Sequence, residues 1–239
     1  MSPAPRKMSP APRKMSPAKD AAVKTASGTS GKTKPSNGGN RIRCGWPSSA
    51  ISIAYHDREW GVPLKDDRKL FEFLVLDAAQ AGLSWEIILR KREGFRAALD
   101  DFDPEKIARY DEKKIRELLG DARIIRNRLK IESAVTNARA LLALQKECGS
   151  FACYIWQFVG GKPKVNACRS LKDIPATSAE SDAMSRALKK RGFRFVGSTI
   201  CYAFMQAAGL VNDHTVGCFR YSELKRRMRH WRIRCSDIQ

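Results

Sequence analysis

The fold class is decided by residues 177–209, TSAESDAMSRALKKRGFRFVGSTICYAFMQAAG. Thr177 and Glu180 have the spacing of a capping box, and the apolar side chains that follow recur on one helical stripe. Basic residues and Gly192 are typical of the end of that helix. Only residues 193–197 separate it from a second apolar helical run. The stretch therefore predicts two helices joined by a tight hairpin.

The hairpin is a candidate phosphate-binding element. Ser198 and Thr199 can cap the second helix, which we expect to end at Gly209. A short turn before an exposed helix N-terminus offers backbone N–H groups to a phosphate, and basic side chains flank this one. The alternative is a packed helical hairpin with a solvated basic end. The residues expected to contact DNA here are Lys190, Arg191, Gly197 and Ser198.

Other parts of the chain also carry helical signals. Apolar residues at 3.6-residue spacing predict a helix over 70–81, with Asp77 on its apolar face. The Asp-Pro-Glu sequence at 103–105 is typical of a helix start. The run 124–145 is rich in Ala and Leu and free of Gly and Pro, which predicts a further long helix. We therefore expect an all-α domain.

Charge points to nucleic acid as the partner. The chain has 239 residues and a formal net charge of +20, so its surface should attract polyanions. It contains no apolar run long enough to span a membrane and no apolar stretch of a secretory signal near its start. We expect a protein with no membrane association. We expect an intracellular protein, which in a bacterium would lie in the cytoplasm with the nucleoid and in a eukaryotic host in the nucleus.

The two ends differ from the middle. Residues 1–40 begin with a repeated MSPAPRK and continue as a Ser, Thr, Gly and Lys stretch. Residues 1–43 hold ten Lys and Arg against one Asp and few large apolar side chains, so this basic, low-complexity tail is predicted to be disordered. It either lies along DNA or is a solvated leader. Residues 225–239 form a basic C-terminal extension, which is either a continued helix or a frayed tail.

Two cysteines and two histidines suggest a metal site. The seven cysteines are odd in number and irregularly spaced, which favours reduced thiols over a disulfide framework. Cys44 and His56 stand near the start of the domain, and His214 and Cys218, four residues apart, near its end. Such a set makes a closed tetrahedral site typical of structural zinc, without an open position for water. Spacing alone leaves a surface histidine and a core thiol as alternatives.

Asp77 is the residue whose position on an apolar helix face is hardest to explain by core packing. A carboxylate on an apolar stripe is costly unless a cation or donors meet it, although a buried helix cap is an alternative. A glycine-broken turn, residues 80–85, follows it. Aromatic faces beside a carboxylate suit a flat cationic ligand. The aromatic candidates are Trp46, Tyr55, Trp85 and Trp60, the last of which we expect to fill the core instead.

Four motifs together resemble one family. They are RCGW at 43–46, YHDREWGVP at 55–63, QAGLSW at 80–85 and the run from KKRGF to HTVGC at 189–218. Over residues 43–224 the chain resembles DNA-3-methyladenine glycosylase I, the bacterial Tag family. The resemblance implies an all-α, helix-hairpin-helix glycosylase-like domain. It also implies one structural Zn²⁺ that joins the two ends of the domain, with the ligands Cys44, His56, His214 and Cys218.

The resemblance also implies the roles of site residues. The family's base-recognising carboxylate aligns with Asp77, where some members carry the longer Glu. Asp77 is therefore the expected catalytic residue. The other matches are Tyr55 and Trp85, which sandwich the base, Trp46 as a further wall, and Gly82 and Leu83 as the tip inserted into DNA.

The implied function is base excision. A monomeric, monofunctional glycosylase would flip 3-methyladenine out of double-stranded DNA and hydrolyse its glycosidic bond, leaving an abasic site. The turn of the hairpin, residues 193–197, contains no Lys such as strand-cleaving glycosylases use to form a Schiff base. The alternative is a non-enzymatic DNA-binding protein with a structural zinc, which leaves Asp77 without a role. A zinc deaminase is disfavoured because its H-x-E…P-C-x-x-C pattern is absent.

Overall fold

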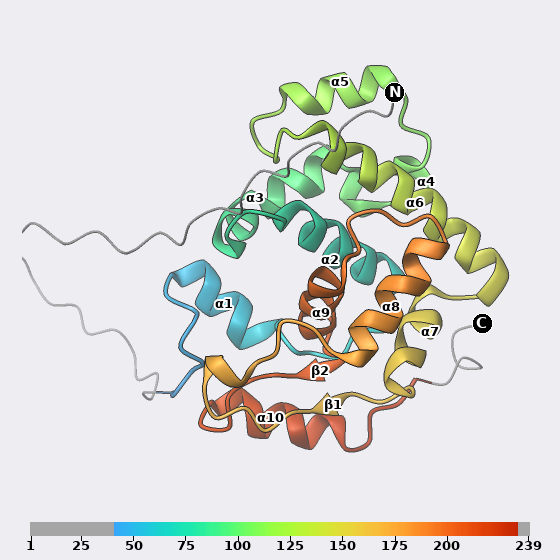
Figure 1. The fold of residues 1–239 in the computed structure, drawn as a ribbon. Coiled ribbons are helices and arrows are strands. Elements are labelled where there is room, and N and C mark those ends of the chain that lie inside the picture. Colours follow the sequence, from blue (N-terminus) through green and yellow to red (C-terminus); the bar gives the residue numbers. More distant parts are fainter. Residues whose placement is uncertain (1–40, 234–239) are drawn as a thin grey trace, which may run out of the picture. The chain divides into compact units, whose positions relative to one another are not determined.

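The structure is a computed structural model that describes residues 41–233. The predicted disordered tail lies outside the described residues and stays a prediction. The described part is mostly helical (Figure 1). Its helices are α1 (Ala50–Arg58), α2 (Asp67–Gln80), α3 (Trp85–Ala98), α4 (Pro104–Ile107), α5 (Glu112–Gly120), α6 (Arg128–Cys148), α7 (Phe151–Trp156), α8 (Ala179–Lys190), α9 (Ser198–Ala207) and α10 (Phe219–Met228), with 3₁₀ turns η1 (Asp100–Phe102), η2 (Gln157–Val159) and η3 (Leu171–Asp173).

The expected all-α class needs one correction. A two-residue strand β1 (Lys164–Val165) pairs in parallel with β2 (Val211–Asn212). The pair ties the segment after η2 to the segment after α9, because Lys164 and Asn166 donate backbone hydrogen bonds to the carbonyls of Leu210 and Asn212. The strands are too short to leave an alternating pattern in the sequence. Within residues 41–233 no helix is long and apolar enough to cross a membrane.

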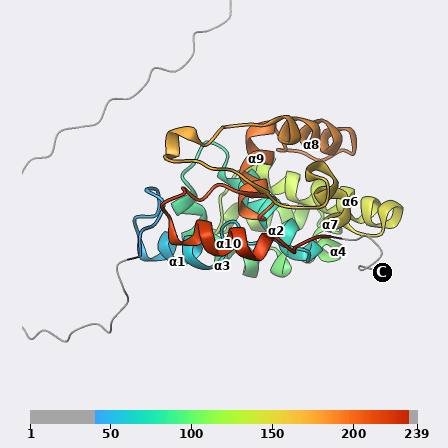
Figure 2. The ribbon, with the colours of Figure 1, turned by 90° about the horizontal axis from the view of Figure 1, so that it is seen from below.

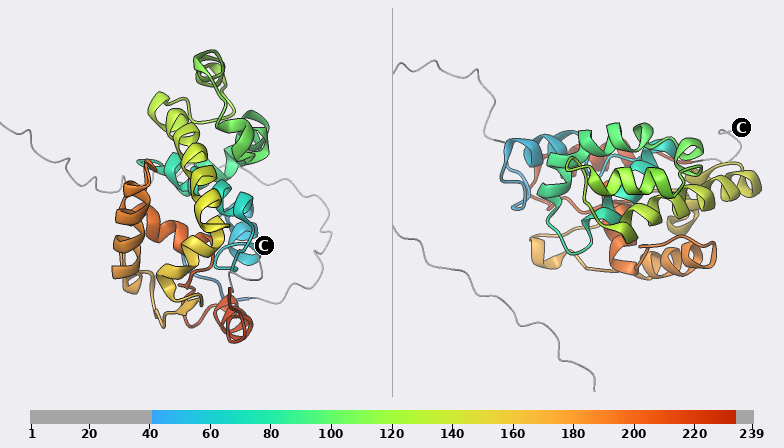
Figure 3. Two further views of the ribbon diagram at one scale, coloured as in Figure 1. Left: turned by 90° about the vertical axis from the view of Figure 1, so that its right-hand side faces the viewer. Right: turned by 90° about the horizontal axis from the view of Figure 1, so that it is seen from above.

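Helix α2 forms the centre of the core. Every residue from 70 to 79 is buried, and α2 contacts α3, α6, α7 and α9. A helix that is buried on all sides belongs to the interior of a domain. The views of Figure 3 show α8 and α9 on one flank of these helices, and α5 at the end opposite α10. Asp77 therefore lies in the interior, as its place on the apolar stripe predicted.

Helix starts follow local capping more closely than hydrophobic pattern. Asn127 accepts a hydrogen bond from the Lys130 N–H and starts α6 at Arg128, so the helix expected from residue 124 begins four residues later. Asp103 caps α4 as predicted and Pro104 is its first residue, but this helix has only four residues.

The hairpin of α8 and α9 is present, but its caps differ from those predicted. Ser178, not Thr177, is the N-cap of α8, and its capping-box partner is Ser181, not Glu180. A Ser-Ser box satisfies the same two backbone N–H groups as a Ser-Glu box, and it leaves Glu180 to pair with Lys164.

The second helix also starts differently. Gly197 is the N-cap of α9, and Ser198 is its first residue, with the hydroxyl bonded to Asp182 and Ser181 of α8. Ser198 therefore joins the two helices instead of capping one. Gly209 ends the hairpin at φ +73°, where an added Cβ would lie 2.4 Å from the carbonyl carbon of Val62. Only glycine fits this approach.

The C-terminal basic run begins inside a helix. The expected boundary at residue 224 falls within α10, which continues to Met228 along β2 (Figure 2). Leu224 and Met228 are buried, and the Trp231 ring lies 3.9 Å from that of Trp156. Of the two expectations for this end, a continued helix describes residues 225–228. Residues 234–239 lie outside the described part.

Candidate functional site

A cavity of about 310 Å³ opens between α1, α2, α9 and the η3 loop. This volume lies at the lower end of the range for small-molecule sites. A larger cavity, about 540 Å³, lies beyond the η3 loop, but its charged wall includes the paired Lys164 and Glu180. The smaller cavity brings together the predicted carboxylate and aromatic residues. The side chains that matter below are Trp46, Tyr55, Trp60, Asp77, Trp85 and Gln206.

Asp77 is buried without a hydrogen-bond partner in the part of the chain that the structure describes. Its side chain is 3% exposed, and within residues 41–233 no group forms a hydrogen bond with its buried Oδ2 atom. The interpretation as a helix cap is therefore wrong. Asp67 on the same helix shows the contrast, because its carboxylate accepts the backbone N–H groups of Phe151 and Ala152. Burial raises the pKa of Asp77 well above its usual value, so the charged form is costly without a cation.

Aromatic rings surround this carboxylate. The ring centroids of Tyr55 and Trp85 lie 5.4 Å apart at 54°, and Trp46 lies 6.3 Å from Tyr55. The indole Nε1 atoms of Trp46 and Trp85 are buried and, like Asp77 Oδ2, have no hydrogen-bond partner within the described residues. Buried polar atoms in proteins are almost always satisfied. Two donors and one acceptor in one cavity therefore indicate a flat, polar ligand.

Trp60 does more than fill the core. It is 8% exposed and lines the cavity, while its ring lies 4.5 Å from the ring of His214. Its backbone carbonyl also lies 3.1 Å from His214 Nε2. Our expectation that Trp60 only fills the core is therefore incomplete.

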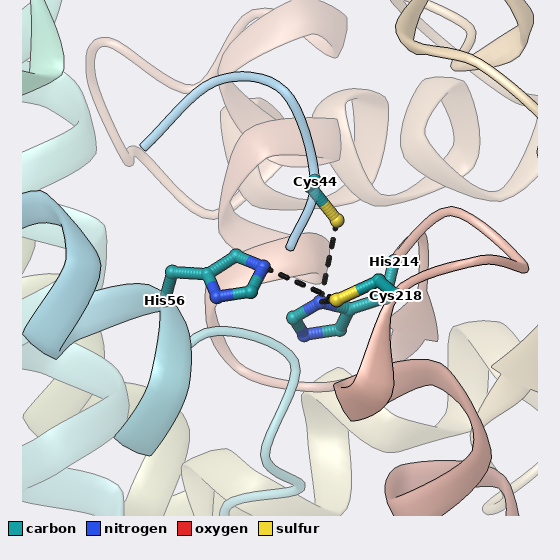
Figure 4. A group of neighbouring side chains, drawn as sticks. All are labelled: Cys44, His56, His214 and Cys218. Carbon is teal, nitrogen blue, oxygen red and sulfur yellow. Dashed lines mark hydrogen bonds between the residues drawn. The ribbon is translucent and has the colours of Figure 1, made fainter. Parts of the chain in front are cut away.

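The four predicted metal ligands meet in one buried cluster (Figure 4). Cys44 comes from the loop before α1, His56 from α1, His214 from the segment after β2, and Cys218 from the N-cap of α10. Their ligand atoms all lie within 4.8 Å of one another. This cluster can hold a metal ion, and its burial contradicts the alternative of a surface histidine.

The cluster distances fit a tetrahedral ion. Cys44 Sγ lies 3.5 Å from His214 Nδ1, and Cys218 Sγ lies 3.6 Å from both His56 Nε2 and His214 Nδ1. Bonds of about 2.3 Å to sulfur and about 2.0 Å to nitrogen place neighbouring ligand atoms about 3.5 Å apart around zinc.

Hydrogen-bond partners orient the two histidines of the cluster. His56 Nδ1 lies 2.7 Å from Asp57, whose carboxylate accepts hydrogen bonds from Arg43 at 2.7–3.0 Å. His214 Nε2 faces the Trp60 carbonyl, so each ring turns its other nitrogen toward the sulfur atoms. Such partners fix the ring orientation of a metal-binding histidine. Sequence reasoning missed Arg43 and Asp57, although both lie next to predicted ligands.

The turn after α2 projects its tip outward. Gly82 has φ +77°, and Leu83 is 37% exposed. Lys130 Nζ donates to the carbonyls of Ala79 and Ala81 at 2.8 and 2.6 Å and so holds the end of α2. The structure thus presents Leu83 as a supported, exposed apolar residue.

The four hairpin residues expected to bind DNA differ in availability. Lys190 is exposed, but Arg191 makes two hydrogen bonds to Glu147, at 2.6 and 2.7 Å. The Ser198 hydroxyl is engaged with α8, and Gly197 lies beside it at the α9 N-terminus. Their contact with DNA stays a prediction.

Comparison with known proteins identifies the class of protein to which this helical fold and this aromatic, carboxylate-bearing cavity belong. The profile of the methyladenine glycosylase family matches residues 46–221, and the chain belongs to this family, as its motifs predicted. It is 52% identical over 180 residues to DNA-3-methyladenine glycosylase 1 of Escherichia coli (strain K12), covering 75% of this chain and 96% of the relative. The DNA-3-methyladenine glycosylase of Haemophilus influenzae is 49% identical, covering 74% and 96%.

Solved structures agree with this assignment. A crystal structure of a 3-methyladenine DNA glycosylase I matches with a TM-score of 0.74 at 53% identity, covering 74% of this chain and 98% of that one. The Staphylococcus aureus enzyme, whose structure concerns 3-methyladenine recognition, matches at 0.73 and 35% identity, covering 76% and 97%. A variant of such an enzyme in complex with 3-methyladenine matches at 0.72 and 34%, covering 74% and 96%.

Proposed function

We propose that this protein is a monofunctional DNA glycosylase that flips 3-methyladenine out of double-stranded DNA, hydrolyses its glycosidic bond and leaves an abasic site. The observation that carries the proposal is the buried, unpartnered carboxylate of Asp77 in an aromatic cavity. Relatives named for 3-methyladenine support the choice of base. We place the protein with chromosomal DNA, as a monomer.

Asp77 supplies discrimination by charge. Methylation at N3 makes the adenine of DNA cationic, and a cation restores the charged form of a carboxylate whose pKa is raised by burial. Neutral adenine has no positive charge with which to stabilise the ionised form of Asp77. A charge-assisted hydrogen bond in this setting contributes about 1.5–3 kcal/mol.

Stacking supplies affinity for the flipped base. Tyr55 and Trp85 line the cavity with Trp46 beside them, and base stacking on aromatic side chains contributes about 1–3 kcal/mol per base. A cation over these rings gains about 0.5–2 kcal/mol more. We propose that Leu83, with Gly82, fills the space that the base leaves in the duplex. This offsets part of the unstacking cost, which is smallest for a damaged base.

The cavity wall also favours hydrolysis without strand cleavage. Among its described lining residues there is no lysine, so a Schiff base to the sugar has no amine to form it. Burial raises the pKa of the Tyr55 phenol, so this side chain stays protonated and offers no phenolate as a general base. The positive charge of the base makes it a good leaving group, so orientation and charge selection carry the reaction.

We propose that the cysteine–histidine cluster binds one structural zinc ion. Four protein ligands close the coordination sphere, so the ion would hold the structure together and take no part in base release. The cluster adjoins the cavity through Trp60 and through the Trp46 ring, which lies 5.4 Å from His56. Metal binding would therefore keep two walls of the cavity in place.

Methylated duplex DNA tests the function. The full chain should release 3-methyladenine, detected by chromatography, and leave strands that break only after alkali. A DNA-binding protein without activity would retain the DNA and release no base, and that result would reject the proposal. Strand breaks before alkali would reject monofunctional action.

A further inference from the structure

Gln206 on α9 lines the same cavity, and the nitrogen of its side-chain amide is already hydrogen-bonded. Its side-chain Nε2 donates to Asp213 Oδ2 at 2.7 Å. Within residues 41–233 no group is found to donate to the Gln206 Oε1 atom. A half-buried amide in a ligand cavity, with one end bonded and the other without a donor, has an acceptor to offer.

The orientation of this amide is set by its partner. Asp213 is 1% exposed, and its Oδ1 accepts from Asn166 at 2.6 Å while its Oδ2 also accepts from Tyr202 at 2.8 Å. A carboxylate only accepts hydrogen bonds, so it always draws the NH₂ end of Gln206 toward itself. Flipping the amide would put two acceptors face to face. The end turned away from Asp213 is therefore a carbonyl oxygen.

Charge and stacking do not explain how the site would distinguish methylated adenine from methylated guanine. Methylation at N3 makes both adenine and guanine cationic in DNA, and both purines are flat. The charge of Asp77 and stacking on the aromatic walls therefore favour both lesions over normal bases, and neither of these two effects separates the lesions from each other. The two differ at position 6, where adenine has an amino donor and guanine a carbonyl acceptor. A fixed acceptor in the cavity can make this distinction.

We propose that Gln206 is a specificity-determining residue whose Oε1 accepts a hydrogen bond from the 6-amino group of the extruded base. Asp213, Tyr202 and Asn166 are positioning residues that hold the amide in this orientation. The inference rests on the proposed function and deepens it. A 6-oxo purine would face carbonyl against carbonyl and lose a hydrogen bond, and sites built for such a bond discriminate strongly against analogues that lack the donor.

The test uses DNA treated with a methylating agent, which carries both 3-methyladenine and 3-methylguanine. Released bases are separated by chromatography, and the ratio of the two release rates is compared between variants. Gln206→Met keeps the length of the side chain and removes the acceptor. We expect this ratio to fall about tenfold, because 3-methyladenine loses a hydrogen bond and 3-methylguanine loses a repulsion.

Gln145→Met is the matched control. Gln145 is also half-buried and also donates its Nε2 to a carboxylate, that of Asp67 at 2.6 Å, but it does not line the cavity. A general loss of an amide–carboxylate bond would affect both variants. The proposal requires that only the Gln206 variant changes the ratio.

The outcomes are distinct. If the wild-type protein releases no 3-methyladenine, the proposed function fails. If it releases 3-methyladenine but the ratio survives in Gln206→Met, or the wild type treats both bases alike, the inference about Gln206 is overturned. If the variant does not fold, a structure of the wild-type protein with 3-methyladenine decides. An amino group bonded to Gln206 Oε1 supports the inference, and one turned elsewhere overturns it.

Discussion

Replacing Asp77 by Asn separates function from stability. The change keeps the size of the side chain and one carbonyl acceptor but removes the negative charge. If the carboxylate selects a cationic base, release of 3-methyladenine should fall by about 10- to 150-fold, the equivalent of a charge-assisted hydrogen bond of about 1.5–3 kcal/mol. The fold should survive, because no described group depends on Asp77 Oδ2 as a partner.

The stability of this variant has a predicted dependence on pH. Burial raises the pKa of Asp77 in the folded protein above its value in the unfolded chain. The folded protein thus keeps a proton that the unfolded chain loses, and this contribution to stability is complete at low pH and is lost as pH rises through the folded pKa. Asn has no such loss. The variant should therefore gain stability relative to wild type as pH rises above the ordinary pKa of an aspartate, about 4.

Asp67→Asn is the control on the same helix. Its carboxylate accepts hydrogen bonds from Gln145, Ser150 and two backbone N–H groups at the start of α7. This variant should lose about 1–2 kcal/mol of stability and keep normal base release per folded molecule. The measurements are thermal unfolding across the pH range and the release rate from methylated DNA. Near-normal release by the Asp77 variant would refute our assignment and leave recognition to shape and stacking.

Four further results are expected. Purified protein should contain about one zinc by elemental analysis, and Cys218→Ser should unfold at a lower temperature; a metal-free protein would contradict this. Deleting residues 1–40 should weaken DNA affinity and its salt dependence, because their charge releases counterions; an unchanged slope would make them bystanders. Leu83→Ala should slow release from duplex DNA yet leave binding of free 3-methyladenine unchanged; weaker base binding would place Leu83 in the pocket. Lys190→Ala should reduce the salt slope by about 1 and Arg191→Ala by less, since Arg191 pairs with Glu147; the reverse order would argue against this hairpin contact.

The sequence predicted those parts of the site that depend on residue types with few structural uses. A carboxylate on an apolar stripe is costly, so Asp77 could be singled out from periodicity alone. Among seven cysteines and three histidines, spacing only suggested a metal site and the family resemblance implied its four ligands, which the structure brings together. The central helix could also be predicted, because an unbroken pattern of apolar residues at helical spacing is compatible with few other structures.

Parts that depend on contacts between distant, ordinary residues could not be predicted. Gln206 is a polar residue in an apolar helix, but its proposed role depends on its hydrogen bond to Asp213. Asp213 in turn accepts from Asn166, and these two residues follow the paired strands β2 and β1. Asp57 is one of many acidic residues in the chain, and only the folded structure shows that its carboxylate lies beside His56 Nδ1. The caps of α8 and α9 were predicted wrongly because Ser, Thr and Gly can all serve as N-caps, so Ser178 and Gly197 could not be told from their neighbours.

The positions of the four cysteine–histidine cluster residues along the chain have a consequence for the order of assembly. Cys44 and His214 are 170 residues apart, so the cluster cannot close until the ribosome has made nearly all of the domain. Trp46 and Trp60, which lie against this cluster, are synthesised early but acquire their final neighbours late. A nascent or truncated chain therefore lacks a finished cavity. The cluster beside the cavity is complete only once the chain has been made as far as Cys218, the N-cap of α10.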